Sequence, residues 1–432
     1  GPNGVRKQAG AADHLGLNPS VPATCFPTSS ATACSWDEKL GEAVGEALGE
    51  EAAAQEVAVL LGPGLNIQRS PLCGRDFEYF SEDPILAGRM AAAYVRGIQK
   101  NGISACPKHF AVNSQELRRM ASDSVLDERT LRELYLTGFE IVVKEAKPKT
   151  IMTSYNLING TYANENAHLL QDILRKDWGF DGAVVTDWGG SNDHALGVKN
   201  GSTLEMPCPG GDSIRELMKA VQDGKISEAD VDARLDEMLE LVLSTHAAVE
   251  KAPRTFDAAA HHKLARRAAA ESIVLLRNEG GILPLKPNEK LAVIGDFAET
   301  PRYQGAGSSA VNALQVDTLL DSIKADDSGI TFVGYASGFE RQGAADAEKL
   351  EEAVALAKKA DTVLLCLGLD ELRESEGLDR SDMKLAENQQ QLLAAVAAVN
   401  PNVVVLLSAG APIETPWAGQ CRALVYGALG GQ

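Results

Sequence analysis

The feature that most constrains the fold is a regular alternation of short apolar segments with longer amphipathic segments over residues 1–248. Each apolar segment is a compact run bounded by Gly, Pro, Asn or a charged residue, which is typical of a buried strand. Strands are predicted at 57–67, 103–110, 150–156, 183–188 and 202–206. Helices are predicted between them at 36–55, 84–100, 127–146, 167–177, 212–223 and 227–245. Such an alternation produces a parallel sheet, and a closed (β/α)₈-type barrel is the commonest solution at about 250 residues.

A second alternation follows an interruption. Residues 249–285 lose the first pattern and are predicted to form a linker and a connecting helix, the latter at 263–279. Residues 286–432 then form another domain. Its strands are predicted at 291–295, 330–335, 362–369, 403–408 and 423–427, and its helices near 314–324, 344–359 and 385–398. This order indicates an open, doubly wound sheet.

Both ends of the chain lack an element that these patterns require. No strand candidate precedes Gly1, so the first barrel strand is expected to be missing, and a barrel without one strand exposes two edges. The chain stops at Gln432, directly after an apolar strand where a further helix is expected. The sequence is therefore expected to be an internal fragment whose second domain is incomplete.

Composition argues against several classes of partner. The chain has 41 Lys and Arg against 60 Asp and Glu, a net charge of −19, which argues against nucleic acid or an anionic membrane surface. No apolar run approaches the ~18 residues of a membrane span. The seven cysteines and seven histidines show no zinc or HExxH spacing, so no metal site is predicted. Because no leader is visible and the cysteine number is odd, a cytoplasmic location is favoured over secretion.

Polar residues cluster directly after the predicted barrel strands. The carboxyl ends of the strands form the catalytic face of a (β/α)₈ barrel. We therefore expect five residues that are far apart in the sequence to converge there: Arg75, Lys108, His109, Tyr155 and Asp187.

Asp187 ends the buried apolar strand in the string VVTDWGG. A carboxylate fixed at a strand end can attack the anomeric carbon of a sugar without further activation. The alternative is that Asp187 caps a helix and accepts hydrogen bonds from backbone amides that follow the strand. The adjacent Trp188 is either a platform for sugar stacking or part of the core.

Cationic side chains could complete a sugar site around this carboxylate. Lys108 and His109 could donate hydrogen bonds to sugar hydroxyls and lower the pKa of a nearby carboxylate, or they could cap a strand in solvent. A histidine-dependent hydrolase dyad is disfavoured, because no nucleophile motif such as GxSxG accompanies His109. Arg75 could clamp vicinal hydroxyls, or it could form an ion pair with the acidic residue at 78, 82 or 83.

Two stretches of the second domain could also carry chemistry. The loop 370–380, DELRESEGLDR, contains Glu371, Glu374 and Glu376. Most such runs are solvated surface. A glutamate on this loop could nevertheless protonate a leaving-group oxygen, provided that its pKa is raised towards neutrality. The stretch GAGSS at 305–309 superficially resembles a dinucleotide loop, but it lacks GxGxxG and lies far beyond its strand, so no cofactor is predicted.

Taken together, motifs spread over essentially the whole chain resemble glycoside hydrolase family 3, the β-glucosidase-type branch. They are GPNGVR at 1–6, LGPGLNIQRSPLCGRDFEYFSEDP at 61–84, KHFAVN at 108–113, MTSYNLING at 152–160, VVTDWGG at 184–190, LLRNEGGILPL at 275–285 and ESEGLDR at 374–380. This combination in this order is highly specific. The resemblance implies a (β/α)₈-type barrel followed by an α/β sandwich, which matches the division inferred from periodicity.

The resemblance also implies a mechanism. Asp187 would be the nucleophile, and Glu376 would be the general acid/base supplied by the second domain. The remaining positions that match would hold the nonreducing sugar, at Arg75, Lys108, His109 and Tyr155, or line the aglycone side, at Trp188. The family is retaining and uses double displacement without metal or cofactor, with the two carboxyls ~5–5.5 Å apart. The aspartate that usually precedes GPNGVR is missing here, and the family usually continues beyond the residue that matches Gln432.

These inferences predict an exo-acting β-glucosidase that releases glucose from the nonreducing end of small β-glucosides or oligosaccharides. A β-xylosidase or mixed-specificity glycosidase is an alternative, and an inactive sugar-binding fragment is another because both ends are expected to be missing. Action on N-acetylhexosaminides is disfavoured, because the strings around KHFAVN differ from those of that branch. A nucleotide-dependent enzyme that uses the sheet in 286–432 is disfavoured by the absence of a phosphate loop.

Overall fold

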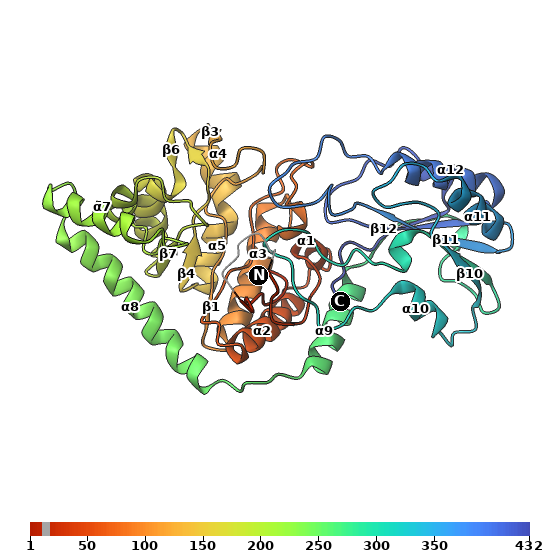
Figure 1. Cartoon of the computed structure of the whole chain (residues 1–432), viewed down its shortest axis with the longest axis horizontal. Helices are drawn as coiled ribbons and strands as arrows, with labels where there is room; N and C mark the ends of the chain where they lie inside the picture. Colours follow the sequence, from red (N-terminus) through yellow and green to blue (C-terminus); the bar gives the residue numbers. More distant parts are fainter. Residues whose placement is uncertain (11–17) are drawn as a thin grey trace.

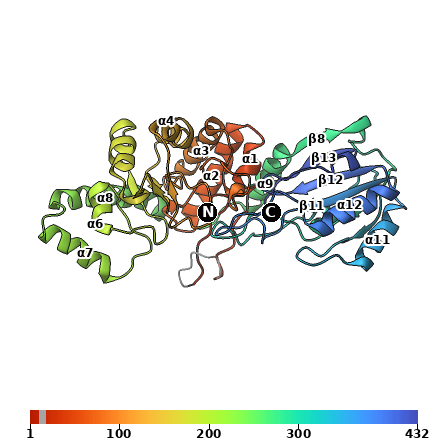
Figure 2. The ribbon, with the colours of Figure 1, turned by 90° about the horizontal axis from the view of Figure 1, so that it is seen from above.

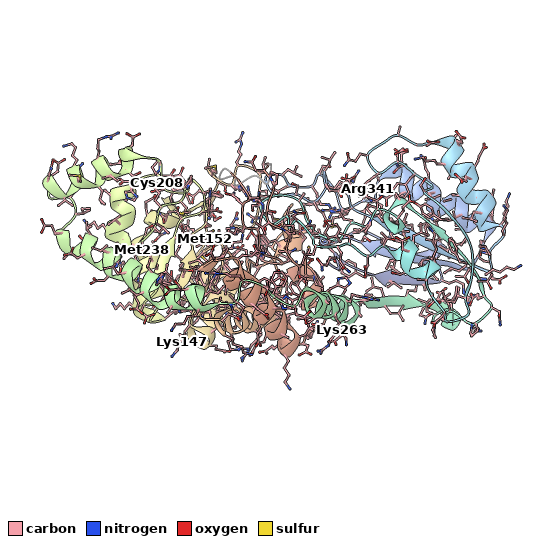
Figure 3. All side chains as sticks on the ribbon, turned by 60° about the horizontal axis from the view of Figure 1, so that its bottom comes forward. Lys147, Met152, Cys208, Met238, Lys263 and Arg341 are labelled. Carbon is pink, nitrogen blue, oxygen red and sulfur yellow. The ribbon has the colours of Figure 1, made fainter. Side chains whose placement is uncertain are left out.

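The structure is a computed structural model, and it describes residues 1–10 and 18–432 of the 432-residue chain. Figure 1 shows an N-terminal lobe that contains helices α1 to α8 and a C-terminal lobe built around a larger sheet. Helix α9 (Ala258–Ser272) lies between them and packs against α1 (Ser29–Ala33) and α2 (Glu38–Ala54). In Figure 3, Met238 of α8 and Lys263 of α9 mark the two helices that the extended segment 252–257 joins.

The strands of the N-terminal lobe are short, and all their pairs are parallel except β5 with β6 in the small separate sheet described below. Strand β1 (Val59–Leu60) pairs with β2 (Ser104–Ala105), and β4 (Thr150–Met152) pairs with β7 (Ala183–Val185). Isolated parallel bridges continue this arrangement between Gly64 and Lys108, Phe110 and Thr153, and Val185 and Leu204. Each predicted strand therefore contributes parallel pairing at its expected place, although 202–206 contributes only one bridge. A small separate sheet contains β3 (Asp123–Ser124), β5 (Leu157–Ile158) and β6 (Thr161–Tyr162).

Helices cover this set of strands. They are α3 (Pro84–Gln99), α4 (Glu128–Thr130), α5 (Thr137–Ala146), α6 (His194–Asn200), α7 (Gly211–Gln222) and α8 (Glu228–Lys251), with π-helical segments at Leu131–Leu136 and His168–Asp177 and short 3₁₀ turns at Asp76–Glu78 and Ala163–Glu165. Aspartates begin several of them. The carboxylate of Asp83 accepts hydrogen bonds from the first amides of α3, and Pro84 occupies the first helical position, where a missing N–H costs nothing. The apolar faces of these helices bury a continuous core, in which Phe110 contacts Phe139 and Trp178 edge to face.

The C-terminal lobe is a six-stranded sheet in the order β10-β9-β11-β12-β13-β8. Its strands are β8 (Val274–Asn278), β9 (Lys290–Ile294), β10 (Thr331–Ala336), β11 (Thr362–Gly368), β12 (Val403–Ser408) and β13 (Ala423–Tyr426). All neighbours are parallel except β8, which pairs antiparallel with β13 at one edge. The central strands are buried almost throughout, as parallel strands covered on both faces must be.

The helices of the C-terminal lobe are α10 (Leu319–Lys324), α11 (Ala347–Ala357) and α12 (Glu387–Val399), with 3₁₀ turns at Glu279–Gly281, Asp296–Ala298 and Ala418–Gln420. Helices α11 and α12 pack against each other and lie on the same side of the sheet (Figure 2). Fold class and order of elements agree with the sequence prediction of a barrel followed by a doubly wound sheet.

One predicted helix is wrong in its extent. The sequence pattern predicts a single helix over 263–279, whereas α9 ends at Ser272 and residues 274–278 form strand β8. The run Val274–Leu276 is short and apolar, and such a run fits a helix or a strand equally well until a partner is present. Pairing with β13 decides for the strand. The segment predicted as linker thus contributes to the sheet, and the domain limits at 248 and 286 stay predictions.

Two further observations concern the chain as a whole. No helix among the described residues is both long and apolar enough to cross a membrane. All seven cysteines lie in the described part of the chain and are free thiols.

Candidate active site

A pocket of about 380 Å³ lies where the carboxyl ends of the barrel strands meet loops of the C-terminal lobe. This volume falls in the range of sites for small ligands. The structure brings all seven predicted site residues to its lining: Arg75, Lys108, His109, Tyr155, Asp187, Trp188 and Glu376. Six of them come from the N-terminal lobe and one comes from the C-terminal lobe.

Asp187 stands two residues beyond the end of β7 and is 9% exposed. Its Oδ1 accepts a hydrogen bond from the backbone N–H of Trp188 (2.8 Å). Its Oδ2 lies 3.5 Å from His109 Nε2 and has no hydrogen-bond partner within the described residues. The helix that follows, α6, is capped by Asp193, so Asp187 is not a helix cap, although it does accept a hydrogen bond from one backbone amide after the strand. Asp187 lines the pocket, and this unpartnered oxygen is buried.

Burial raises the pKa of Asp187, and the positive charges of Arg75 and Lys108 oppose this rise without cancelling it. The cations therefore act in the direction expected from the sequence, but burial is the larger effect and the net shift of the pKa is upward. A second carboxylate lies between the two cations.

That carboxylate is Glu78, which is buried between two cations. Its Oε2 accepts a hydrogen bond from Arg75 Nε (2.7 Å), and its Oε1 lies 3.0 Å from Lys108 Nζ. The exposed fractions of Arg75, Glu78 and Lys108 are 1%, 2% and 6%. Arg75 therefore forms the ion pair that the sequence offered as an alternative and still lines the pocket. The charges of Arg75 and Lys108 outweigh burial and keep the pKa of Glu78 below its ordinary value.

His109 is held in place on three sides. Its backbone N–H donates to Asn66 Oδ1 (2.7 Å), and its carbonyl accepts from Asn66 Nδ2 (2.8 Å). Its Nδ1 lies 3.2 Å from the hydroxyl of Tyr79. Burial, reinforced by the charges of Arg75 and Lys108, lowers the pKa of His109, so the imidazole is neutral at pH 7. Lys108 and His109 are buried, and the alternative of a strand cap in solvent is therefore wrong.

Tyr155 and Trp188 form the wall next to Asp187. The hydroxyl of Tyr155 donates to the carbonyl of Trp188 (3.0 Å), and the guanidinium of Arg119 lies 4.8 Å from the centre of the Tyr155 ring. Trp188 is half-buried and packs on a small apolar cluster that includes Met152, labelled in Figure 3. It therefore lines the pocket and contacts the core at once, and its part in sugar stacking stays a prediction.

Glu376 reaches the pocket on the loop that follows β11. Its Oε1 lies 2.8 Å from Arg119 Nη1 and 3.4 Å from Arg75 Nη1, and its Oε2 accepts a hydrogen bond from the N–H of Ser308 (2.7 Å). Burial favours the neutral acid, but the two guanidinium groups and Ser308 outweigh it, so the pKa of Glu376 is lowered well below its usual range. The sequence-based requirement of a raised pKa is not met in the sugar-free pocket.

The other glutamates of this loop face elsewhere. Glu374 is fully buried, accepts a hydrogen bond from the N–H of Gly410 (2.8 Å) and lies 3.5 Å from Arg302 Nη1. Glu371 is partly exposed and pairs with Arg341, which Figure 3 labels in the C-terminal lobe. Of the three glutamates, Glu376 is the one in the pocket lining.

Sequence reasoning missed Glu116, Arg119 and Ser308 around the site. It offered Glu78 as a partner of Arg75 but missed its contact with Lys108. Glu78 carries a weak signal, because an acid three residues after Arg75 suggests an ion pair. Nothing local distinguishes Arg119 from its neighbour Arg118. Ser308 belongs to the stretch GAGSS at 305–309, which contacts Glu376 twice: the N–H of Ser308 donates to its carboxylate, and the carbonyl of Ala306 accepts from its backbone N–H (3.1 Å). Among the described residues, no group of three or more His, Cys, Asp or Glu is arranged to hold a metal ion.

Comparison with family models adds independent information. The model for the glycosyl hydrolase family 3 N terminal domain matches residues 16–241, and the model for the glycosyl hydrolase family 3 C-terminal domain matches residues 273–432. Together they cover most of the chain.

Individual relatives agree with these matches. The chain is 46% identical to the thermostable beta-glucosidase B of Acetivibrio thermocellus over all of its own length and 57% of that protein. It is 45% identical to the exo-alpha-(1->6)-L-arabinopyranosidase of Bifidobacterium breve, over 100% of the chain and 58% of the relative. The chain thus spans less than two thirds of the length of these relatives.

Solved structures are similar to both lobes together. The GH3 beta-glucosidase of Bifidobacterium adolescentis has a TM-score of 0.92 and 44% identity, with 96% of this chain and 61% of that chain covered. Beta-glucosidase 3B of Thermotoga neapolitana, solved in complex with glucose, has a TM-score of 0.89 and 33% identity, with 100% and 64% covered.

Proposed function

Because this chain belongs to glycoside hydrolase family 3, we propose that it carries the active site of a retaining exo-β-glucosidase that acts on terminal nonreducing β-D-glucosyl residues. The observation that carries the proposal is that Asp187 and Glu376, from different lobes, line one pocket of sugar size. Beta-glucosidases among the relatives and structural neighbours support the choice of substrate. Net charge supports a small neutral glycoside as the partner.

The proposed reaction is a double displacement. Asp187 attacks the anomeric carbon through its free Oδ2, while Glu376 gives a proton to the departing glycosidic oxygen. Water, deprotonated by Glu376, then cleaves the glycosyl–Asp187 ester and releases the sugar with retained configuration. Neither step requires a metal or a cofactor.

The other lining residues hold the sugar in this proposal. The cationic groups of Arg75 and Lys108 can donate to hydroxyls because Glu78 occupies only part of their donor capacity. Neutral His109 donates from one ring nitrogen, and Tyr155 stands beside the nucleophile. Trp188 supplies a flat apolar face for the aglycone side.

The surroundings of Glu376 favour its ionised form, whereas the first step needs its acid form. Among the charges that lower the pKa of Glu376, Arg75 has the largest effect, and Arg75 lines the pocket, so it is the group that a sugar engages for the pKa of Glu376 to rise. Sugar binding thus exchanges a carboxylate partner of Arg75 for hydroxyl partners. Proton donation is coupled to occupation of the pocket by this exchange.

The test uses the protein at its natural full length. In Asp187→Asn the nucleophile is lost with little change in volume, so hydrolysis of an aryl β-D-glucoside falls at least ~10⁴-fold while the circular dichroism spectrum stays unchanged. In Glu376→Ala, azide restores turnover of a substrate with a good leaving group. Glu371→Gln, on the same loop but outside the pocket, serves as the control with unchanged turnover.

Two outcomes would contradict these assignments. Substantial activity in Asp187→Asn removes it as the nucleophile. Absence of azide rescue in Glu376→Ala would transfer the acid/base role to Glu374, which lies in a separate buried network.

Substrate choice needs its own comparison. The similarity to an exo-alpha-(1->6)-L-arabinopyranosidase makes an α-L-arabinopyranoside the second candidate, and a β-D-xyloside tests the predicted alternative. We expect the highest kcat/KM for the β-D-glucoside among the three aryl glycosides. Glucose binding without turnover of any of them would indicate a sugar-binding protein. The cytoplasmic location stays a prediction, and the oligomeric state stays open.

A further inference from the structure

The loop that carries Glu376 is attached to the opposite lobe by Asp379, three residues further on. Asp379 Oδ1 accepts hydrogen bonds from the N–H groups of Gly74 (3.1 Å) and Glu116 (3.0 Å). Its Oδ2 accepts from the N–H of Leu117 (2.9 Å). All three donors belong to barrel loops. The hydrogen bonds that this side chain of the C-terminal lobe accepts from Gly74, Glu116 and Leu117 therefore all run to the N-terminal lobe.

The attachment is reciprocal. The carboxylate of Glu116, on the barrel, accepts a hydrogen bond from the N–H of Gly377 (2.8 Å), the residue directly after Glu376. The N–H of Arg380 donates to the carbonyl of Leu72 (2.8 Å). On the C-terminal side of Glu376, the loop is therefore bonded to the barrel by the backbone of Gly377 and Arg380 and by the side chain of Asp379.

The contact is too close for any side chain at position 74. A Cβ atom on Gly74 would lie 1.7 Å from the carbonyl oxygen of Leu378 and 2.5 Å from that of Ser375. From the other side, a Cβ on Gly307 would lie 2.4 Å from Cβ of Glu376. The loop is thus confined between a glycine of each lobe, and the barrel backbone itself is the surface on which it rests.

We propose that Asp379 is a positioning residue that sets the place of Glu376 relative to Asp187 by docking this loop on the barrel. The proposal rests on the proposed function. It has a simple geometric basis: Asp187 and Glu376 belong to different lobes, so contacts between the lobes fix their separation. Asp379 does not line the catalytic pocket. It lines a second cavity, together with Cys73 and Arg380.

Misplacement of an acid by about 1 Å can cost ~100-fold in rate, and proton transfer requires heavy atoms within ~2.6–3.2 Å. Loss of the docking contact therefore affects the step that needs the proton of Glu376. It leaves a step that needs no acid almost unchanged.

The experiment compares kcat/KM for two substrates in the protein at its natural full length. Phenyl β-D-glucoside needs an acid to expel its leaving group, whereas 2,4-dinitrophenyl β-D-glucoside does not. In Asp379→Asn, an amide N–H₂ replaces one acceptor oxygen without creating a cavity. We expect kcat/KM to fall ~10- to 100-fold for the phenyl substrate and less than ~3-fold for the dinitrophenyl substrate. Their ratio is independent of the amount of correctly folded enzyme, so a merely structural effect would not change it.

Two variants give the reference points. Asp382→Asn changes a carboxylate nearby whose partners, Arg373 and Lys384, belong to its own lobe, and it should leave the ratio unchanged. Glu376→Ala should show the largest loss of kcat/KM that is confined to the phenyl substrate. The double variant with Asp379→Asn should have the same ratio of the two kcat/KM values as Glu376→Ala alone. If Asp379→Asn does not fold, Gly74→Ala replaces it, because one added carbon displaces the same loop.

The outcomes separate the two hypotheses. Equal losses on both substrates in Glu376→Ala would contradict the proposed function. A selective loss in Glu376→Ala together with an unchanged ratio in Asp379→Asn, or in Gly74→Ala in its place, would overturn the positioning role and leave the function standing.

Discussion

The two sides of the pocket are built in different ways. On the barrel side, Arg75, Lys108 and Glu78 form a buried network whose members all belong to one lobe. On the other side, Glu376 extends on a loop that has contacts to both lobes, to Ser308 of its own lobe and to Arg119 and Glu116 of the barrel. The network on the barrel side is therefore built from one lobe, whereas the place of Glu376 depends on contacts between the lobes.

The electrostatics of the two sides differ in the same way. The pKa of Asp187 is raised because burial outweighs the cations around it. The pKa of Glu376 is lowered because Arg75 and Arg119 outweigh its burial. The same cations are thus outweighed by burial at Asp187 and outweigh burial at Glu376.

The largest effect is expected from breaking the barrel network. Replacing Glu78 by Gln leaves two buried cations, Arg75 and Lys108, without their shared counterion. We expect the free energy of unfolding to fall by about 3–5 kcal/mol, because an uncompensated buried charge is costly. Urea denaturation followed by circular dichroism measures this loss.

The matched control for Glu78→Gln is Glu82→Gln, four residues further on in an exposed position, with an expected change within ~0.5 kcal/mol. If the two variants lost equal stability, the barrel side would not be held by this network, and the contrast between the two sides would disappear.

A second prediction concerns Asp76, a buried carboxylate of the barrel whose pKa is also raised by Glu374 of the other lobe. Asp76 of the barrel is fully buried, neither of its carboxylate oxygens has a hydrogen-bond partner within the described residues, and burial together with Glu374 raises its pKa to about 8. Because the folded state holds this proton more tightly than the unfolded state, the contribution of Asp76 to the free energy of unfolding is expected to fall as pH rises from 3.8 to about 8.

The variant Asp76→Asn cannot titrate and should lack this fall. Its stability relative to wild type should therefore increase by up to about 1.4 kcal/mol per pH unit across that window. Urea denaturation curves at several pH values between 4 and 8 provide the test. Parallel pH profiles for the two proteins would show that Asp76 is already ionised in the folded state.

The smallest expected change in stability concerns the residues at which helices begin. Helices α2, α3, α6 and α8 of the barrel lobe begin after a residue whose side chain accepts a backbone hydrogen bond. Helix α12 begins after Ala386, whose methyl side chain cannot accept one. Ala386→Ser should raise the melting temperature, with a gain of about 0.5–1 kcal/mol. An unchanged melting temperature in Ala386→Ser would mean that water already satisfies the first amides of α12.

Asp83→Ala at the start of α3 should cost about 1 kcal/mol in the same thermal assay.

The sequence predicted those parts of the site that depend on strand ends. Asp187, Lys108 and His109 each follow an apolar run, and a parallel barrel brings such ends together whatever the details of packing. Their roles came from motif resemblance and stay proposals. Strand β8 was missed because the apolar run at 274–276 is compatible with a helix until β13 is placed beside it.

The contacts of the second lobe were beyond local sequence reasoning. Glu374 and Glu376 differ little in their surroundings along the chain. Their distinct environments arise from Gly410 for Glu374 and from Ser308 for Glu376, both far away in the sequence. Arg119 likewise becomes recognisable only once the loop bearing Glu376 is docked next to it.

The junction between the lobes has a mechanical consequence. Only Ile273 separates α9, which packs on the barrel, from the first strand of the other lobe. At the far end, the N–H of Gln432 donates to the carbonyl of Cys25 (2.8 Å), so the same lobe is tied to the barrel again. Further hydrogen bonds join the lobes between these two ties: the N–H of Ala23 donates to the carbonyl of Asn312 (3.0 Å), and the N–H of Leu314 donates to the carbonyl of Ala23 (3.1 Å). Because the lobes are already joined at these points, the part proposed for Asp379 is to fix the loop that bears Glu376 and not the orientation of a whole lobe.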